Sequence, residues 1–307
     1  MKQISTYITE KLKLNKDSGS KYNYYPEDKD ELRSLIEQLF EERGPNADLN
    51  DIDVSEITDM GRLFYELDPH NIDISEWDVS NVTSMFNMFW NCENFNSDLS
   101  KWDVSKVKYM NAMFDNCEKF NSDLSKWDVS KVEDMSAMFG DCKNFNSDLS
   151  KWDVSKVKYM NAMFYSCKNF NSDLSDWDVS NVNTMYRMFY DSTNFNSDLS
   201  KWNVSNVEDM NGMFVRCENF NSDLSNWDVS KVKSMENMFF HCRNFNSDLS
   251  KWNTKSVRVM FGMFCGCRNF NSDLSNWNIE KAHKNQSGMF LGCKSLTIKP
   301  KWYTGKI

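Results

Sequence analysis

Apolar side chains recur along the chain in a pattern whose spacing changes within every 25 residues. In Trp102–Lys126, the apolar residues three or four positions apart are Val107, Met110, Met113, Phe114 and Cys117. This spacing places all of them on one face of a helix. Ser105 precedes the run, where its hydroxyl can accept a hydrogen bond from a backbone N–H group as an N-cap. The pattern therefore predicts one short helix in this stretch.

The spacing then shortens to an alternation typical of an extended chain. Phe120 and Leu124 are apolar and are expected to point inward, whereas Asn121, Asp123 and Ser125 are polar and are expected to point outward. The stretch is bounded by polar residues of the kind that terminate strands. The sequence predicts one short strand after each short helix.

The whole pattern repeats. The tryptophans that follow one another at a spacing of 25 are Trp77, Trp102, Trp127, Trp152, Trp177, Trp202, Trp227, Trp252 and Trp277. A degenerate first unit covers Ile52–Glu76, and the last unit carries one extra residue before Gly288, which makes ten units. A single unit is too small to be stable alone, so the units must stack. The predicted fold class is an α/β repeat solenoid, leucine-rich-repeat-like, with a short strand and a short helix in each unit.

The ends of the chain depart from the repeat. Leu32, Leu35, Ile36, Leu39 and Phe40 form an apolar stripe that predicts a capping helix, and Gly44-Pro45 ends it. Each regular unit contains the segment FNSDLS, as at Phe120–Ser125. At the C-terminal end of the chain, SLTIKPKWYTGKI takes the place of this segment and is suited to protect the open edge of the stack from pairing with another chain. The predicted organisation is a polar N-terminal tail over 1–22, an N-terminal helical cap over 23–51, the solenoid over 52–302 and a C-terminal tail over 303–307.

Composition restricts the class of partner. The formal net charge of −9 argues against nucleic acid, whose binding depends on Lys and Arg. Met1–Ser20 has no apolar core of a signal peptide, and no apolar run is long enough to insert into a membrane. We therefore expect a cytoplasmic protein, a monomer or weak oligomer, with the cell surface as the alternative location.

The repeat resembles a known family. The unit W-D-V-S-x-V-x-x-M-x-x-M-F-x-x-C-x-x-F-N-x-D-L-S is similar to the BspA-like leucine-rich repeats of bacterial surface proteins, also grouped as DUF285. The resemblance covers Ile52–Trp302, and LNDIDVSEITDMGRLF at Leu49–Phe64 is similar to the segment that precedes such arrays. It implies a leucine-rich-repeat solenoid with a parallel strand ladder, acting through protein–protein contacts or adhesion. It implies no catalytic residue.

The Asn and Asp columns of FNSDLS form a candidate structural ladder. Its members are Asn96, Asp98, Asn121, Asp123, Asn146, Asp148, Asn171, Asp173, Asn196, Asp198, Asn221, Asp223, Asn246, Asp248, Asn271 and Asp273. Stacked carboxylates repel one another, so something must offset the repulsion. Hydrogen bonds from backbone N–H groups of the same and adjacent turns would do so. Calcium between turns and a polar strand face that binds a repetitive partner are the alternatives.

Cysteine and histidine give little indication of chemistry. The chain has nine cysteines, and eight of them share one column that Ser192 interrupts, which favours reduced, buried thiols over zinc or disulfides. Cys265-Gly-Cys267 is the nearest approach to a zinc motif. The three histidines, in different units, are His70, His241 and His283. The sequence predicts no catalytic, cofactor-binding or metal-binding residues.

Comparison of the units separates fixed positions from variable ones. The variable positions fall on the exposed side of the predicted helix and carry aromatic residues, which are favoured anchors in protein interfaces. The candidate protein-binding residues are Phe86, Trp90, Tyr109, Tyr159, Tyr165, Tyr186, Tyr190, Phe240 and Phe261. Drift at unconstrained positions explains the variation equally well. The leading hypothesis is a non-enzymatic protein–protein interaction scaffold; a surface adhesin for host or matrix components is the alternative, followed by a metal-dependent binder.

Overall fold

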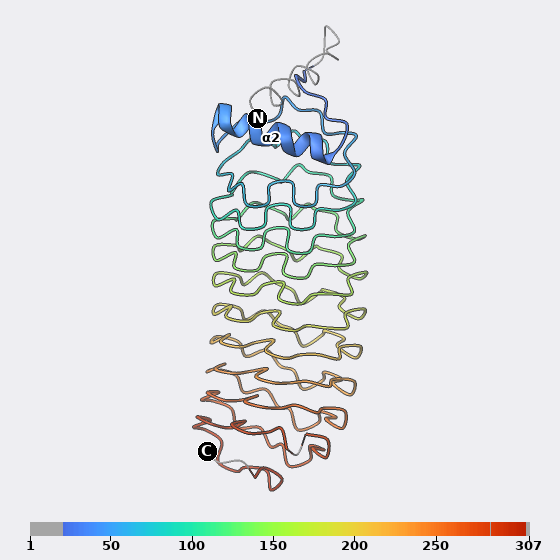
Figure 1. Ribbon diagram of the computed structural model, residues 1–307. Coiled ribbons are helices and arrows are strands. Elements are labelled where there is room, and N and C mark those ends of the chain that lie inside the picture. Colours follow the sequence, from blue (N-terminus) through green and yellow to red (C-terminus); the bar gives the residue numbers. More distant parts are fainter. Residues whose placement is uncertain (1–20, 283, 305–307) are drawn as a thin grey trace.

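The computed structural model describes residues 21–282 and 284–304. The chain winds into a tall stack of similar coils that follow one another from the N-terminal to the C-terminal end (Figure 1). Helix α2 (Lys29–Arg43) lies across the N-terminal end of this stack. Most of the tails predicted over 1–22 and 303–307 lies outside the described residues, so these boundaries stay predictions.

The predicted fold class, a leucine-rich-repeat-like α/β solenoid, is wrong. Within the described part of the chain the structure has one α-helix, α2, and no strand or sheet; the only β-type pairing between neighbouring coils there consists of isolated parallel bridges. These bridges connect residues one repeat apart, as between Tyr109 and Asp134. The 25-residue repeat sets the register of the stack, but its units are built from neither helices nor strands.

Consecutive turns replace the helix predicted over Ser105–Cys117. The N–H group of Met113 donates to the carbonyl of Met110 at 3.1 Å, and the N–H group of Cys117 donates to that of Phe114 at 2.9 Å. Each bond spans three residues, whereas an α-helix bonds residues four apart. Apolar residues recur every three positions because each turn closes on an apolar residue. The spacing alone resembled one face of a helix.

The backbone between these turns bonds to the next coil. Every second N–H group from Met110 to Asn116 donates along the stack; Ala112, for example, bonds to the Ser136 carbonyl at 2.7 Å, and Asn116 to the Gly140 carbonyl at 2.7 Å. Ala112 and Asn116 have positive φ angles of 51° and 60°. Left-handed residues are incompatible with a right-handed helix. The repeat therefore divides its backbone hydrogen bonds between its own turns and the neighbouring coil.

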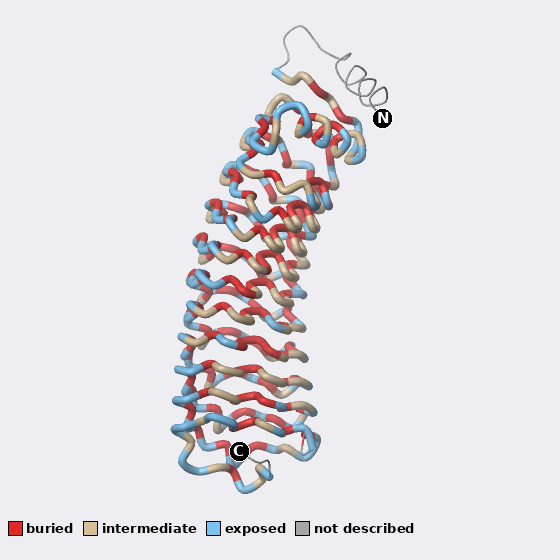
Figure 2. The backbone as a smooth tube through the Cα atoms, turned by 60° about the vertical axis from the view of Figure 1, so that its left-hand side comes forward, coloured by how far each residue is buried: buried red, intermediate tan, exposed pale blue. Residues whose placement is uncertain are grey.

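Aromatic side chains stack in columns through the core. The rings of Trp152 and Trp177 lie 6.5 Å apart with planes within 2° of parallel. Phe139 stacks on Phe164 of the next coil at 5.7 Å and on Phe145 of its own coil at 4.0 Å. Buried and exposed stretches alternate around each coil (Figure 2). The apolar residues of successive units thus form one continuous core, which a single unit could not make.

The buried polar atoms of the core also donate along the stack. The indole N–H of Trp152 donates to the Leu124 carbonyl of the preceding coil at 3.0 Å. The thiol of Cys142 donates to the Phe114 carbonyl, also of the preceding coil, at 3.0 Å. Burial raises the pKa of the Cys142 thiol well above its ordinary value, so the group keeps its proton. Each buried donor joins two coils.

Ser192 shows what the cysteine column requires. Its hydroxyl donates to the Phe164 carbonyl at 2.5 Å, in the same place as the thiols of the other units. The side chain is fully buried, as the neighbouring Cys167 and Cys217 are. The position therefore accepts a small side chain that can donate a hydrogen bond to the coil before it.

The Asn and Asp columns bond to backbone N–H groups in two ways. The side-chain oxygen of Asn121 accepts from the N–H group of Asn146 in the next coil at 2.8 Å. The carboxylate of Asp148 accepts from the N–H group of Ser150 in its own coil at 2.9 Å. The backbone and hydroxyl donors of Ser150 hold the pKa of Asp148 below its ordinary value. Asn thus joins coils, whereas Asp closes a turn.

The first serine of FNSDLS was missed from the sequence. Ser147 is only 8% exposed although its neighbours Asn146 and Asp148 face solvent. Its hydroxyl accepts from the N–H group of Leu124 in the preceding coil at 2.9 Å. The alternation of inward and outward residues could have placed this serine inside. Its hydroxyl supplies an acceptor to a backbone group that would otherwise be buried without one.

Helix α2 (Lys29–Arg43) covers the N-terminal end of the stack. It begins after Asp28, whose carboxylate accepts from the N–H group of Glu31 at 2.9 Å, and it ends at Gly44, where φ is 79°. Its buried residues are Leu32, Leu35, Ile36 and Leu39. This apolar face covers the core of the first coil.

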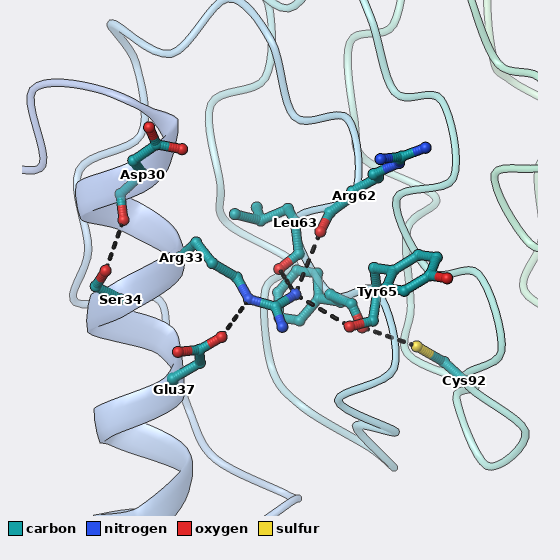
Figure 3. A network of polar contacts seen from close by, with 9 residues as sticks. Asp30, Arg33, Ser34, Glu37, Arg62, Leu63, Tyr65 and Cys92 are labelled. Atoms are coloured by element: carbon teal, nitrogen blue, oxygen red, sulfur yellow. Dashed lines mark hydrogen bonds and ion pairs between the residues drawn. The ribbon is translucent and has the colours of Figure 1, made fainter.

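Arg33 of this helix covers polar groups as well (Figure 3). Its Nη1 donates to the carbonyls of Leu63 at 2.9 Å and Tyr65 at 3.1 Å. In the later coils the equivalent carbonyls, those of Met113 and Asp115 for example, accept from N–H groups of the coil before. The first coil has no coil before it, so the guanidinium supplies the missing donors.

We expect Cys142→Ser to lose less stability than Cys142→Ala. Serine keeps a donor for the Phe114 carbonyl, as Ser192 does for Phe164, whereas alanine leaves a void and removes the bond. The alanine variant should lose about 1–2 kcal/mol of unfolding free energy. Urea denaturation of both variants measures the difference. A serine variant less stable than the alanine variant would show that the column does not act through this bond.

Candidate protein-interaction face

The nine predicted binding residues lie on the turn-built segment of each coil, between the valine equivalent to Val107 and the position of the cysteine column, and not on a helix. Tyr109, Tyr159 and Phe261 are the most exposed, at 46%, 43% and 48%. The six that are partly buried are Phe86, Trp90, Tyr165, Tyr186, Tyr190 and Phe240. We call this side of the stack the variable face.

One cluster forms near the N-terminal end of the variable face. Trp90 stacks on Tyr65 of the preceding coil with ring centroids 4.8 Å apart. The guanidinium of Arg62 lies 5.5 Å from the ring centroid of Phe86 and 5.9 Å from that of Tyr65. These distances are within the range of cation–π attraction. The predicted residues Phe86 and Trp90 therefore belong to one ordered group.

A second cluster lies in the middle of the stack. Tyr165 stacks on Tyr190 with ring centroids 4.9 Å apart. Arg187 lies over both Tyr186 and Tyr190, at 4.9 Å and 5.4 Å from the ring centroids. Three of the predicted residues are thus brought together around a cation. Their mutual contacts order the side chains before any partner arrives.

The remaining predicted residues are not brought together. Tyr109 and Tyr159 stand on alternate coils, with Asp134 bridged to both of them in between. Among the described residues, no ring stacks on Phe261. Phe240 contacts the ring of His241, with centroids 4.4 Å apart. The variable face therefore carries two aromatic clusters and a few isolated rings.

A hollow of about 160 Å³ lies beside the second cluster. Its lining residues are Arg187, Tyr190, Asn211, Gly212, Val215, Asn237 and Phe240. Tyr190 and Phe240 occupy the same position in alternate coils, and the coil between them carries the smaller Val215 there. The two rings stand about 10 Å apart along the stack, twice the spacing between neighbouring chains. This order of large, small and large side chains makes a gap one coil wide.

Gly212 keeps the floor of this hollow open. Its φ is 63°, in the left-handed region that favours glycine. A Cβ atom there would lie 3.2 Å from Cγ of Arg187 and 3.6 Å from Cγ2 of Val215. A larger residue would therefore displace the arginine that lies against Tyr190. The hollow depends on local sequence differences and not on the repeat itself.

A half-buried carboxylate lies under the first cluster. The indole N–H of Trp90 donates to the carboxylate of Asp115 at 3.2 Å. Gly140 of the next coil leaves room for it, since a Cβ atom at Gly140 would lie 2.5 Å from Oδ1 of Asp115. Burial raises the pKa of Asp115 to about 6, and the charge of Asp141 raises it further. The carboxyl of Asp115 therefore keeps its proton to a higher pH than an exposed aspartate does, and its hydrogen-bond partner is the indole of Trp90.

A comparison of the sequence with models of protein families agrees with the 25-residue repeat. The family model described as "Mycoplasma protein of unknown function, DUF285" matches residues 34–152, 122–216 and 194–303. The chain belongs to the DUF285 family. A search of curated proteins found no match. The three overlapping matches show a repeat protein and give no function.

In this DUF285 chain the residues that the structure describes were compared with the arrangement that a metal site requires. No three His, Cys, Asp or Glu side chains of residues 21–282 and 284–304 lie close enough to hold a metal ion. His241 is separated from His70 along the stack, and burial followed by the charge of Arg216 lowers the pKa of His241. His283 lies outside the described residues. The helices of the described part include none that could cross a bilayer.

Sequence reasoning missed the residues that complete the hollow in the DUF285 repeat. Arg187 stands in a column that holds Asn, Ala or Gly in the units from Asn87 to Gly262 around it, and Gly212 follows it in the next coil. That exchange of a small residue for a cation was visible among the units. The missing information was the turn geometry, which places this column beside Tyr190 rather than on the opposite side of a helix.

We expect Asp115→Asn to stabilise the chain at pH 7.5 and to have little effect near pH 4. The folded-state pKa of about 6 lies above the ordinary value of 3.8, so ionisation costs more in the folded state, and stability falls as pH rises between these values. The gain at pH 7.5 should be on the order of 2 kcal/mol. Urea denaturation at both pH values measures it.

Asp148→Asn is the matched control for this change, because the pKa of Asp148 is lowered by the Ser150 donors. Its folded state favours the carboxylate, so the variant should lose stability at pH 7.5 and lose less as the pH falls toward the folded-state pKa. If the two variants respond to pH in the same direction, Asp115 is not the buried acid described here.

Proposed function

We propose that this protein is a non-enzymatic scaffold that binds a protein partner on its variable face. The observation that carries the proposal is the hollow between Tyr190 and Phe240, with Arg187 at its edge. A gap one coil wide between two rings suits a planar or branched side chain inserted from a partner. Tyr and Arg are also the residues that dominate binding energy in protein interfaces.

The order already present in the clusters supports this role. Stacking of Tyr165 on Tyr190 and the contact of Arg187 with both Tyr186 and Tyr190 restrict their rotamers before binding. A partner then loses less free energy to the ordering of these side chains. The stack supplies a rigid support, since each coil is bonded to its neighbours at every second residue of the face.

The resemblance to BspA-like surface proteins favours a related alternative, an adhesin that binds host or matrix components. Both readings use the same variable face and differ in where the protein acts. We propose the scaffold first because it rests on the hollow beside Tyr190, whereas the adhesin rests on the resemblance of the repeats alone. Fractionation of the source cells separates the two readings, since intact protein on the cell exterior would require the adhesin.

The test is capture of the partner by the intact chain. Wild-type protein and the double variant Tyr190→Ala, Phe240→Ala are immobilised and exposed to extract of the source cells, and retained proteins are quantified by mass spectrometry. We expect a partner whose recovery falls about tenfold or more with the double variant, since two interface anchors are removed.

The control variant is Lys126→Ala, Lys151→Ala, which alters exposed residues outside the variable face. It should retain the partner, and all three proteins should be folded at the temperature of the capture, as circular dichroism can check, because the changed side chains are not buried in the core. Equal recovery of every retained protein by the wild type and the Tyr190, Phe240 variant would contradict a role for the hollow.

A further inference from the structure

The position that follows the cysteine column is charged in most units, and in the middle of the stack these charges are paired. Lys143 forms an ion pair with Glu118 of the preceding coil. Lys168 forms one with Asp191 of the next coil, at 3.7 Å. Opposite charges on neighbouring coils attract each other there, so the column gains stability instead of losing it to repulsion.

The pairing stops at the C-terminal end of the stack. The last three units carry only cations at this position, and these are Arg243, Arg268 and Lys294. Arg243 pairs with Glu218 at 3.3 Å, whereas Arg268 and Lys294 form no ion pair with any residue of 21–282 and 284–304. Like charges on adjacent coils repel each other, and an anion placed beside them would remove this repulsion.

These three cations line a hollow of about 300 Å³. Its lining residues are His241, Arg243, Cys265, Gly266, Arg268, Leu291, Gly292 and Lys294. This volume is at the lower end of the range for small-molecule sites. The side chain of Leu291 is 48% exposed, so the hollow offers apolar surface as well as positive charge.

Two glycines open this hollow. Gly266 and Gly292 occupy the position before the cysteine column, where the earlier units carry larger side chains. Asp191 and Arg216 adopt the same left-handed backbone at this position, each with a φ of 58°, so the conformation does not require glycine. A Cβ atom at Gly266 would lie 3.0 Å from the ring of His241. The glycines therefore supply space beside the imidazole.

The imidazole of His241 is oriented at the hollow by its neighbour. Its ring contacts that of Phe240, with centroids 4.4 Å apart. Burial lowers the pKa of His241, and the charges of Arg216 and Arg243 lower it further, so the ring is neutral above pH 7. A neutral imidazole keeps one N–H group that can donate to an anion.

We propose that this C-terminal hollow binds a phosphomonoester carried on a planar apolar body, that is, an aryl phosphate. A phosphomonoester carries a charge of about −1.5 to −2 at neutral pH, which matches the two unpaired cations Arg268 and Lys294. The guanidinium of Arg268 can donate two parallel hydrogen bonds to phosphate oxygens, and the apolar body covers Leu291. A carboxylate has a single charge and would leave one cation unpaired.

This chemistry occurs both in a free aryl phosphate and in a phosphorylated tyrosine of a protein. The hollow is lined by other residues than the hollow beside Tyr190, and the inference does not depend on the proposed function. A partner bound on the variable face and an aryl phosphate bound here are separate events, and each has its own test.

The test measures binding of phenyl phosphate to the intact chain by isothermal titration calorimetry. We expect saturable binding whose affinity falls about tenfold or more with Arg268→Gln, Lys294→Gln, because both unpaired charges are removed. The matched variant Lys126→Gln, Lys151→Gln removes two exposed lysines elsewhere and should bind as the wild type does. Phenyl sulfate has the same shape with a single charge and should bind more weakly.

Nuclear magnetic resonance of the wild-type chain locates the ligand without any substitution. The imidazole resonances of His241 should shift as phenyl phosphate is added, and those of His70, which lies outside the hollow, should not. A peptide with a phosphorylated tyrosine that binds more tightly than phenyl phosphate would assign the site to a phosphorylated protein. Binding of phenyl phosphate without binding of the peptide would assign it to a free small molecule.

Several results would overturn the proposal. They are the absence of saturable binding, an equal loss of affinity in the two double variants, and binding that leaves the resonances of His241 unchanged. Binding of phenyl sulfate as tight as that of phenyl phosphate would show that the two cations do not select a doubly charged group.

Discussion

Hydrogen bonding between coils at a fixed register is the constraint on which the rest of the structure depends. Each turn-built segment gives every second N–H group to the next coil, as Ala112 does to Ser136, and the constant unit length keeps these pairs aligned from coil to coil. The last unit carries one extra residue, and its register shifts accordingly, with Met260 bonded to Asn285. The hydrogen bonds between the last two coils are kept around the inserted residue, although the bonded residues are one position further apart in the sequence.

The fixed register explains why the polar residues of the unit repeat as strictly as its apolar residues. Asn121, Ser147 and Cys142 each supply a side-chain atom to the backbone of a neighbouring coil. Loss of the hydrogen-bonding atom at any of these positions leaves a backbone group without its partner, which costs more than the loss of an exposed side chain. On the variable face the bonds between coils join backbone groups, and side chains take part in only some units, as where the carboxylates of Asp134 and Asp209 accept from N–H groups two residues on. Differences among units can therefore accumulate there and be used for recognition.

Much of this arrangement could be predicted from the sequence. The spacing of 25 gave the units, and the stripe Leu32, Leu35, Ile36 and Leu39 indicated a helix where α2 (Lys29–Arg43) lies. The helix predicted after Ser105 was wrong because a three-residue period is shared by consecutive turns and by one helical face. Backbone conformation separates them, and the positive φ at Ala112 leaves no trace in the pattern of apolar residues.

Only part of the candidate site could be predicted from the sequence, for the same reason. The aromatic residues could be identified from the differences among units, and they lie on one face. The hollow between Tyr190 and Phe240 could not, because it depends on Arg187 and Gly212, whose neighbours follow from the turns. The pairs of residues that contact each other from one unit to the next could be predicted only once the register of the hydrogen bonds between coils was known.

Hydrogen exchange followed residue by residue tests the central claim most directly. The account predicts that the N–H groups of Ala137, Phe139 and Asn146, which bond to a neighbouring coil, exchange about a hundredfold or more slowly than those of the exposed residues Lys126 and Lys151, which have no acceptor within the described residues. Equal and rapid exchange at the two sets of positions would contradict a stack held together by bonds between its coils.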